Sequence, residues 1–256
     1  PCTSVILVKM MERNPALAGV IMFEYTLSES TLRILKNFAS IGGSVILKPG
    51  TTQKTMNAAK SMVAIAEFVE PWPKETPVFM LSELLANISA YGKPVLGLDE
   101  KQFIIRGADS VSHVEYPYSD ASVVMGVPDR TFDTSNEWAT FTLPASAVAE
   151  IKKFSAINNL PVITIVLNGA KGTIEVKPMD DKNPSSRSYF YPVHADAKNI
   201  ADGAIKSLGT HTVKFKTEHF DVLLDGAYEV KVGEWPYVSF RHQSEPVSYI
   251  IVQKSN

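Results

Sequence analysis

The sequence contains almost no cysteine: Cys2 is the only one among 256 residues. A single thiol cannot form an internal disulfide, so a disulfide framework is excluded and a reducing compartment is expected. The five histidines are scattered and form no cluster with cysteine, so we expect no metal site and no cofactor. Asp180 and Asp181 are paired in the polar stretch "MDDKNPSSR", where we interpret them as solvated turn residues.

The sequence also lacks an excess of charge of one sign. Its 25 basic and 27 acidic residues give a net charge of −2, so any contact with nucleic acid must come from a local basic face. No apolar run is long enough to span a membrane, because Lys9, Glu12 and Arg13 interrupt the N-terminal segment. This segment does not have the form of a signal peptide either. A start at Met22 would make residues 1–21 an extension, and we expect residues 1–24 to be an N-terminal extension before the first domain.

From Tyr25 onward, a pattern of apolar residues occurs four times. Two positions with the spacing of a strand are followed by two positions with the spacing of a helix face. The four sets are Tyr25/Leu27/Leu32/Leu35, Val78/Met80/Leu85/Ile88, Phe141/Leu143/Val148/Ile151 and Val213/Phe215/Phe220/Leu223. Each set predicts a strand followed by a helix.

A helix-ending residue and further strand-like runs follow each set. The helix-ending residues are Gly42-Gly43, Gly92, Asn158-Asn159 and Gly226. A β-rich run, a turn and more β-rich sequence come next, and the runs that close the units are "MVAIAEFVE", "SVSHVEYPY", "SRSYFYPV" and "PVSYIIVQK". The sequence therefore predicts an α+β fold made of four β-α-β-β-β units.

The glycine-rich stretch "LKNFASIGGSVILKPG", residues 35–50, resembles a phosphate-binding loop at first sight. A P-loop runs from strand to glycine loop to helix, with Ser or Thr after its lysine. Here the order is helix, glycines, strand, and a proline follows Lys48. We interpret the glycine pair as the end of a helix and "KPG" as a hairpin turn.

The four units predict two similar domains, each made of two units. Residues 119–137, rich in Ser, Asp and Pro, lie between the second and third units and form the expected interdomain connector. The predicted domains are residues 25–118 and 138–256.

The helices should each bury one stripe and expose the other face. With Leu32 and Leu35 pointing inward, the first helix exposes Arg33, Lys36 and Asn37. By the same geometry, Lys152 and Lys153 are exposed on the third helix. Lys216 is exposed at the start of the fourth helix, and Lys93 follows the second helix, which is nearly uncharged. On any one helix, such lysines can equally be ordinary solubility residues.

Three stretches resemble the sliding clamps of T-even-type bacteriophage DNA polymerases. The first is "LSESTLRILKNFASIGGSVILKPG", similar to a family segment with "LLKNFA" and an "LKSG"-like turn. The others are "VAEIKKFSAINNLPVITIVLNG" in the third unit and "SDASVVMGVP" in the connector. The resemblance covers residues 25–254 approximately. It implies the DNA-clamp fold, with helices lining a ring and sheets outside.

Residue by residue, Lys36 matches a lysine of the family's first helix, Lys153 an arginine of the third, and Lys48 the lysine of the hairpin turn. The resemblance therefore implies that these residues face duplex DNA; Arg33, Lys93, Lys152 and Lys216 are added from face geometry alone. Eight helices packed about 10 Å apart close a ring with about 15 Å of clear width, whereas twelve leave about 28 Å. The wider ring fits a duplex, so a homotrimer is expected.

The resemblance also implies protein partners, namely a replicative DNA polymerase and a clamp loader. By analogy, a short hydrophobic peptide of the partner would dock near the connector or at a subunit boundary. The candidates are Val123, Val124 and Met125 in the connector, and Tyr249, Ile250, Ile251 and Val252 in the last strand. A core role explains the last four equally well.

Two other functions compete with the clamp. An enzyme would use Glu218-His219 with Asp221, or His113 with Glu115, but no serine elbow, metal motif or nucleotide loop accompanies these residues. A non-enzymatic β-rich phage assembly protein would oligomerise without needing lysines on several helices. We therefore expect a clamp without catalytic activity, in the cytoplasm of an infected bacterial cell.

Overall fold

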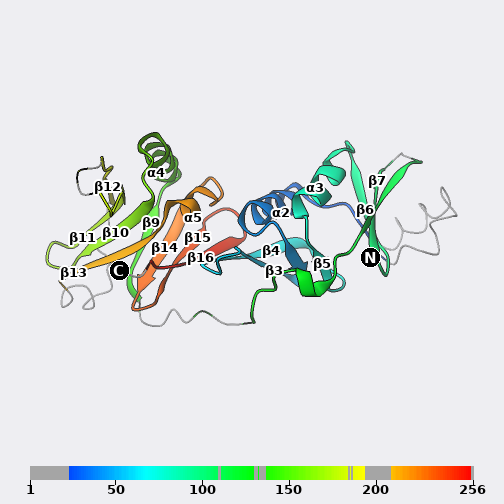
Figure 1. Cartoon of the computed structure of the whole chain (residues 1–256), viewed down its shortest axis with the longest axis horizontal. Helices are drawn as coiled ribbons and strands as arrows, with labels where there is room; N and C mark the ends of the chain where they lie inside the picture. Colours follow the sequence, from blue (N-terminus) through cyan, green and yellow to red (C-terminus); the bar gives the residue numbers. More distant parts are fainter. Residues whose placement is uncertain are drawn as a thin grey trace. The chain divides into compact units, whose positions relative to one another are not determined.

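The computed structural model describes residues 23–108, 111–129, 132, 137–183, 185, 187–193 and 209–254. The chain divides into two compact units, unit 1 (Pro1–Thr55 and Ala66–Gly126) and unit 2 (Met56–Ile65 and Val127–Asn256). The four predicted β-α-β-β-β repeats follow one another along the chain (Figure 1).

The first repeat consists of β1 (Phe23–Tyr25), α2 (Glu29–Ile41), β2 (Val45–Leu47), β3 (Gly50–Met56) and β4 (Met62–Trp72). The second consists of β5 (Thr76–Val78), α3 (Leu81–Ser89), β6 (Pro94–Leu98), β7 (Gln102–Gly107) and β8 (His113–Pro117). The two repeats exchange their first strands, because β1 pairs with β6 in the sheet β1-β6-β7-β8 while β5 pairs with β2. Phe23 and Glu24 therefore lie in a strand, although the sequence placed them in an extension; the rest of that predicted extension lies outside the described residues.

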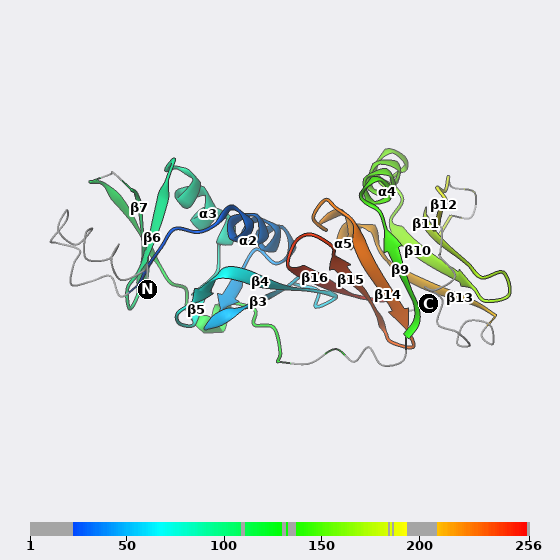
Figure 2. The same cartoon turned by 180° about the vertical axis from the view of Figure 1, so that it is seen from behind.

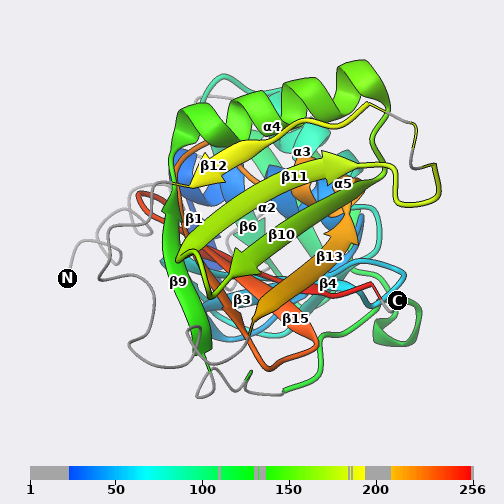
Figure 3. The ribbon, with the colours of Figure 1, turned by 90° about the vertical axis from the view of Figure 1, so that its left-hand side faces the viewer.

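The third repeat consists of β9 (Glu137–Leu143), α4 (Ala145–Asn158), β10 (Val162–Asn168), β11 (Thr173–Met179) and β12 (Tyr191–Val193). The fourth consists of β13 (Thr210–Lys216), α5 (Thr217–Asp221), β14 (Tyr228–Gly233), β15 (Tyr237–His242) and β16 (Val247–Val252). The same exchange occurs here: β13 joins the sheet β12-β11-β10-β13, and β9 pairs with β14. Figure 3 shows the first of these sheets face on, with α4 along its β12 side.

Among the described residues, each unit has two neighbouring α-helices. In unit 1, α2 and α3 lie side by side above β3, β4 and β5 (Figures 1 and 2), and the Leu81 amide donates to the Gly43 carbonyl at 2.9 Å. In unit 2, α5 is a single short helix of five residues in contact with α4. The core of unit 2 is aromatic: Phe240 packs against Phe215 at 5.7 Å, Phe220 at 6.0 Å and Tyr228 at 6.1 Å between ring centroids.

Two of the four predicted helix ends are confirmed, at Gly42 and Asn159, whereas α3 is capped by Ala90 and α5 by Val222, before the predicted Gly92 and Gly226. Gly42 caps α2 and Gly43 follows with φ +70°, while Asn159 caps α4 in the left-handed conformation. Gly50 opens β3 with φ +106°, so "KPG" is a turn and the glycine pair is a helix end. The order helix, glycines, strand is thus the one predicted.

The predicted connector contains a short 3-10 helix, η1 (Ala121–Val123), and β9 begins at its last residue, Glu137. A second segment of unit 2 was not foreseen. The turn between β3 and β4, inside Met56–Ile65, belongs to unit 2, where its Ser61 carbonyl accepts a hydrogen bond from the Val252 amide at 2.8 Å. The predicted domain boundaries remain a prediction.

Candidate nucleic-acid interface and partner site

The first basic face is positioned by the N-terminus of α2. Ser28 caps the helix, its hydroxyl accepting from the Thr31 amide at 3.2 Å. The Glu70 carboxylate accepts from the Ser28 amide at 2.8 Å and from the Thr31 hydroxyl at 2.6 Å. These bonds fix the rotation of the helix about its axis, so that Arg33 and Lys36 are exposed as predicted.

One residue of this face was assigned wrongly. Asn37 is only 6% exposed, and Leu32, expected inside, is half-buried. The buried stripe is made of Thr31, Ile34, Leu35, Asn37 and Phe38, so it is rotated away from Leu32 and towards Asn37. The exposed stripe is correspondingly narrower than predicted.

The second basic face belongs to α4, where two adjacent lysines differ. Lys153 is exposed, and its ammonium lies 6.0 Å from the Phe154 ring, which stacks on Tyr189 at 4.6 Å. The Lys152 side chain is only 20% exposed. Its ammonium donates to the Leu223 carbonyl at 2.6 Å and to Asp225 Oδ1 at 3.0 Å. Lys153 therefore matches the predicted free position, whereas Lys152 already has partners within the fold.

The remaining predicted basic residues lie at element ends. Lys93 is exposed after α3. Lys216 precedes α5 and pairs with Glu218 at 2.9 Å. Lys48 is half-buried in its turn, where its backbone amide donates to Gln53 Oε1 at 2.8 Å and its carbonyl accepts from Gln53 Nε2 at 2.7 Å. These positions do not form one continuous helix face with Lys36 or Lys153.

The residues predicted to bind a partner peptide fall into two groups. Val123 is 57% and Val252 42% exposed, and Met125 is half-buried. The other four are buried: Val124, Tyr249, Ile250 and Ile251. Strand alternation explains Tyr249 and Ile251, because their side chains point into the core of unit 2. None of the four buried side chains forms a surface, so the assignment of Val124, Tyr249, Ile250 and Ile251 to a docking site is corrected here.

The sequence did not reveal an aromatic group in unit 2. Phe132, from the connector, packs edge-on against Tyr237 at 5.5 Å, and Tyr237 stacks on Trp235 at 5.6 Å. Gln253, directly after β16, donates from its side chain to the Trp235 carbonyl at 2.6 Å. The group thus brings the connector next to the end of the last strand. In the sequence, the signal for it was the pair of aromatic residues that flank Pro236 in "EWPY".

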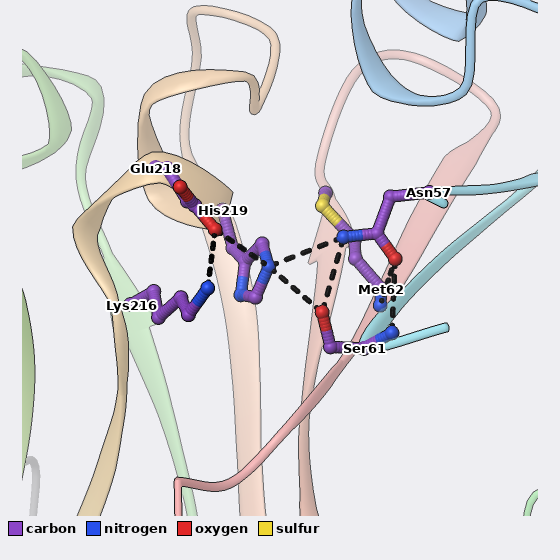
Figure 4. Close-up of polar contacts among 6 residues, drawn as sticks. All are labelled: Asn57, Ser61, Met62, Lys216, Glu218 and His219. Carbon is purple, nitrogen blue, oxygen red and sulfur yellow. Dashed lines mark hydrogen bonds and ion pairs between the residues drawn. The ribbon is translucent and has the colours of Figure 1, made fainter. Parts of the chain in front are cut away.

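Of the residues considered for catalysis, Glu218 and His219 are shown in Figure 4. His219 Nε2 lies 3.0 Å from Ser61 Oγ and 3.7 Å from Glu218 Oε1. In a serine-histidine-acid relay, the carboxylate binds the ring nitrogen opposite the serine. Here both groups face the same nitrogen, and Nδ1 has no hydrogen-bond partner among the described residues. His113 and Glu115 form only an exposed pair at 3.4 Å. The geometry of Figure 4 does not provide a relay.

The same group has a structural role. Asn57 Oδ1 accepts from the Ser61 and Met62 amides at 2.9 and 3.0 Å, which directs the Asn57 amide nitrogen to His219 Nε2 at 3.3 Å. Because an amide nitrogen only donates, Nε2 accepts and the neutral ring carries its proton on Nδ1. Neutral His219 therefore holds the β3–β4 turn against α5.

This arrangement predicts a pH dependence. Burial lowers the pKa of His219; Glu218 acts against this shift and Lys216 adds to it. As the pH falls below about 6.5, the unfolded chain takes up the proton before the folded one, so stability present above that pH is lost below it. We expect H219Q to lose less stability than the parent chain between pH 7 and pH 5 in urea unfolding. His113→Gln, at an exposed site, should behave as the parent; equal losses in both variants would contradict the assignment.

Two further features concern metals and membranes. Within the described residues, no group of three or more His, Cys, Asp and Glu side chains could hold a metal ion. None of the helices described is long and apolar enough to cross a membrane.

Comparison with known proteins agrees with this geometry. No protein-family model matches the chain. A sliding clamp of Vibrio phage KVP40 is 26% identical over 165 residues, which are 64% of this chain and 74% of that protein.

The fold is shared with solved clamps. Proliferating cellular nuclear antigen (PCNA) of Entamoeba histolytica matches 92% of this chain and all of its own, with 11% identity and a TM-score of 0.63. The DNA polymerase III β subunit of Pseudomonas aeruginosa matches 91% of this chain over 65% of its own, with 14% identity and a TM-score of 0.62. These matches show the predicted DNA-clamp fold and do not favour a phage assembly protein. The sequence similarity to a phage sliding clamp and the shared clamp fold together support the predicted resemblance of this chain to the bacteriophage DNA polymerase sliding clamps.

Proposed function

We propose that three copies of this chain form a ring around duplex DNA and tether a replicative polymerase for processive synthesis, without catalysis of their own and without a cofactor. The observation that carries the proposal is the exposed lysine on the longer helices of both units, Lys36 on α2 and Lys153 on α4. Sequence-independent contacts of lysine with phosphates are weak and sensitive to salt, which permits sliding. The ring itself prevents dissociation.

The ring would close through strand edges. β8 ends its sheet in unit 1, and β12 ends its sheet in unit 2. An edge strand presents free backbone groups that can pair with another chain. Pairing of β8 in one copy with β12 in the next is a head-to-tail contact, which closes into a ring when the rotation allows it. Pro192 in β12 is compatible with this position, because proline is tolerated on edge strands.

Partner binding would use exposed apolar residues of unit 2 and the connector. The solved complex of the C-terminal region of FEN-1 with A. fulgidus PCNA, which has 14% identity to this chain and a TM-score of 0.62, shows a clamp binding the C-terminal region of another protein. By analogy, we propose that a hydrophobic peptide of the polymerase or of the clamp loader docks beside Val252 and the Phe132–Tyr237 pair. Val123 and Met125 remain candidates in the connector. The site of action would be the cytoplasm of the infected cell.

Topology distinguishes a clamp from an ordinary DNA-binding protein. Native mass spectrometry should show three copies of the 28.1 kDa chain, a mass of about 84 kDa. After loading on a nicked circular plasmid, the protein should co-elute with the DNA and be lost when the plasmid is linearised, because a ring slides off a free end. Equal retention on circular and linear DNA would contradict the ring.

A further inference from the structure

The lysines predicted to face DNA differ from one another in their ionic partners. Lys152 pairs with Asp225 at 3.0 Å, and Lys216 pairs with Glu218 at 2.9 Å. In the part of the chain that the structure describes, Lys36, Lys93 and Lys153 form no ion pair. Of these five lysines, all predicted to face DNA, two are thus neutralised by the protein and three are not.

Asp225 is held in place by the backbone around it. It lies between α5 and β14, and its carbonyl is 3.2 Å from His242 Nε2. His242 Nδ1 accepts from the Ser244 and Glu245 amides at 3.1 and 2.9 Å, so the proton is on Nε2 and is donated to Asp225. The histidine is only 4% exposed. A buried ring therefore fixes the backbone that carries the carboxylate.

The two side chains of this pair differ in exposure. The Asp225 side chain is 95% exposed, whereas the Lys152 side chain is 20% exposed and its ammonium also binds the Leu223 carbonyl. The lysine is fixed, and the carboxylate covers it from the solvent side. An ion pair with one fully exposed member is weak, so a phosphate group can displace the carboxylate but must compete with it.

Glu218 has the same relation to Lys216. Both side chains are more than half exposed, and the hydrogen bond from Lys216 lowers the pKa of Glu218, which keeps the carboxylate ionised near neutral pH. Burial raises the pKa of a third acidic residue, Asp221, and the nearby charge of Lys152 acts against this shift. The acidic residues of this region are thus interleaved with its lysines.

We propose that Asp225 and Glu218 are intramolecular counterions, which compete with DNA phosphates for Lys152 and Lys216. This competition lowers the affinity of unit 2 for the duplex. This inference rests on the proposed clamp function. A clamp that must slide needs contacts that exchange quickly, and a nearby carboxylate replaces each phosphate as it leaves. Unit 1 keeps unpaired Lys36, so the two units would contribute unequal contacts.

The test compares D225N with a matched control. Glu100→Gln makes the same charge change at an exposed position in the turn between β6 and β7. Binding of the full-length protein to a fluorescein-labelled duplex is measured by anisotropy over a series of salt concentrations. We expect D225N to bind about three to ten times more tightly, and its salt slope to steepen by about 0.9 per lysine released. E100Q should change affinity less than twofold.

A second variant links the effect to its lysine. In a K152M background, D225N should no longer tighten binding, because there is then no lysine for which Asp225 and a phosphate could compete. E218Q tests the same idea at Lys216 without touching α4. If D225N and E218Q bind no more tightly than E100Q, or if D225N still tightens binding without Lys152, the counterion role is wrong. If the unsubstituted protein is not retained on circular DNA in the loading experiment, the clamp function itself is wrong.

Discussion

Replacing Lys36 and Lys153 together by glutamate is expected to lower affinity for duplex DNA about 100-fold, because each change removes a phosphate contact and adds repulsion. Both lysines are exposed and make no ion pair within the described residues, so folding should be unaffected. Loading on nicked circular plasmid would measure the loss, and native mass spectrometry would show an unchanged assembly.

The matched control is the pair K101E and K182E, which makes the same charge change at exposed positions in turns. These lysines lie away from α2 and α4 in the chain, and their replacement should leave loading within about twofold of the parent. If K101E/K182E lowers loading as much as K36E/K153E, the effect is one of net charge. The assignment of a DNA-facing helix surface would then be wrong.

Substitution of Gly226 by alanine is expected to destabilise the protein by about 3 kcal/mol, because a buried clash and backbone strain act at the same position. Gly226 has φ +154°, and a Cβ atom there would lie 2.2 Å from His242 Nε2. The ring cannot move aside easily, since it is buried, accepts from two backbone amides and packs edge-on against Tyr228 at 4.9 Å. Urea unfolding followed by tryptophan fluorescence would measure the loss.

Gly92 provides the comparison for this variant. It does not have a positive φ, and a Cβ atom added there would have nothing within 4 Å, so G92A should change stability by less than about 0.5 kcal/mol. Equal stability of G226A and G92A would show that the loop around Asp225 relaxes at no cost. That outcome would also weaken the view that His242 holds Asp225 in place.

The sequence was sufficient to predict the order of helices and strands, but it was not sufficient to predict the contacts between segments that are distant in the chain. Gly43, Asn159 and Gly50 act locally, through backbone conformations that few residues adopt, and their roles were predicted. Lys36 and Lys153 follow from helix periodicity and from the resemblance to clamps. The exchange of β1 and β5 between repeats depends on which strands pair with each other, and local sequence patterns do not specify strand pairing.

The misplaced side chains have the same explanation. Lys152 was assigned to an open surface, yet its partner Asp225 is 73 residues away in the chain. Asn37 lies in a stripe whose centre depends on how α2 is rotated, and Glu70 contributes to that rotation from another strand. Tyr249 and Ile251 belong to a strand with apolar residues on both faces, so alternation alone did not separate inside from outside.

The turn between β3 and β4 has a consequence for dissecting the molecule. Cleavage in the connector would give two fragments, and the residues around Asn57 and Ser61 would remain on the N-terminal one. The C-terminal fragment would lose the partners of His219 and of the Val252 amide. Neither half of the chain is therefore an autonomous module. A nicked protein should stay associated until it is denatured, and a C-terminal half expressed alone should require the missing turn to be supplied as a separate peptide.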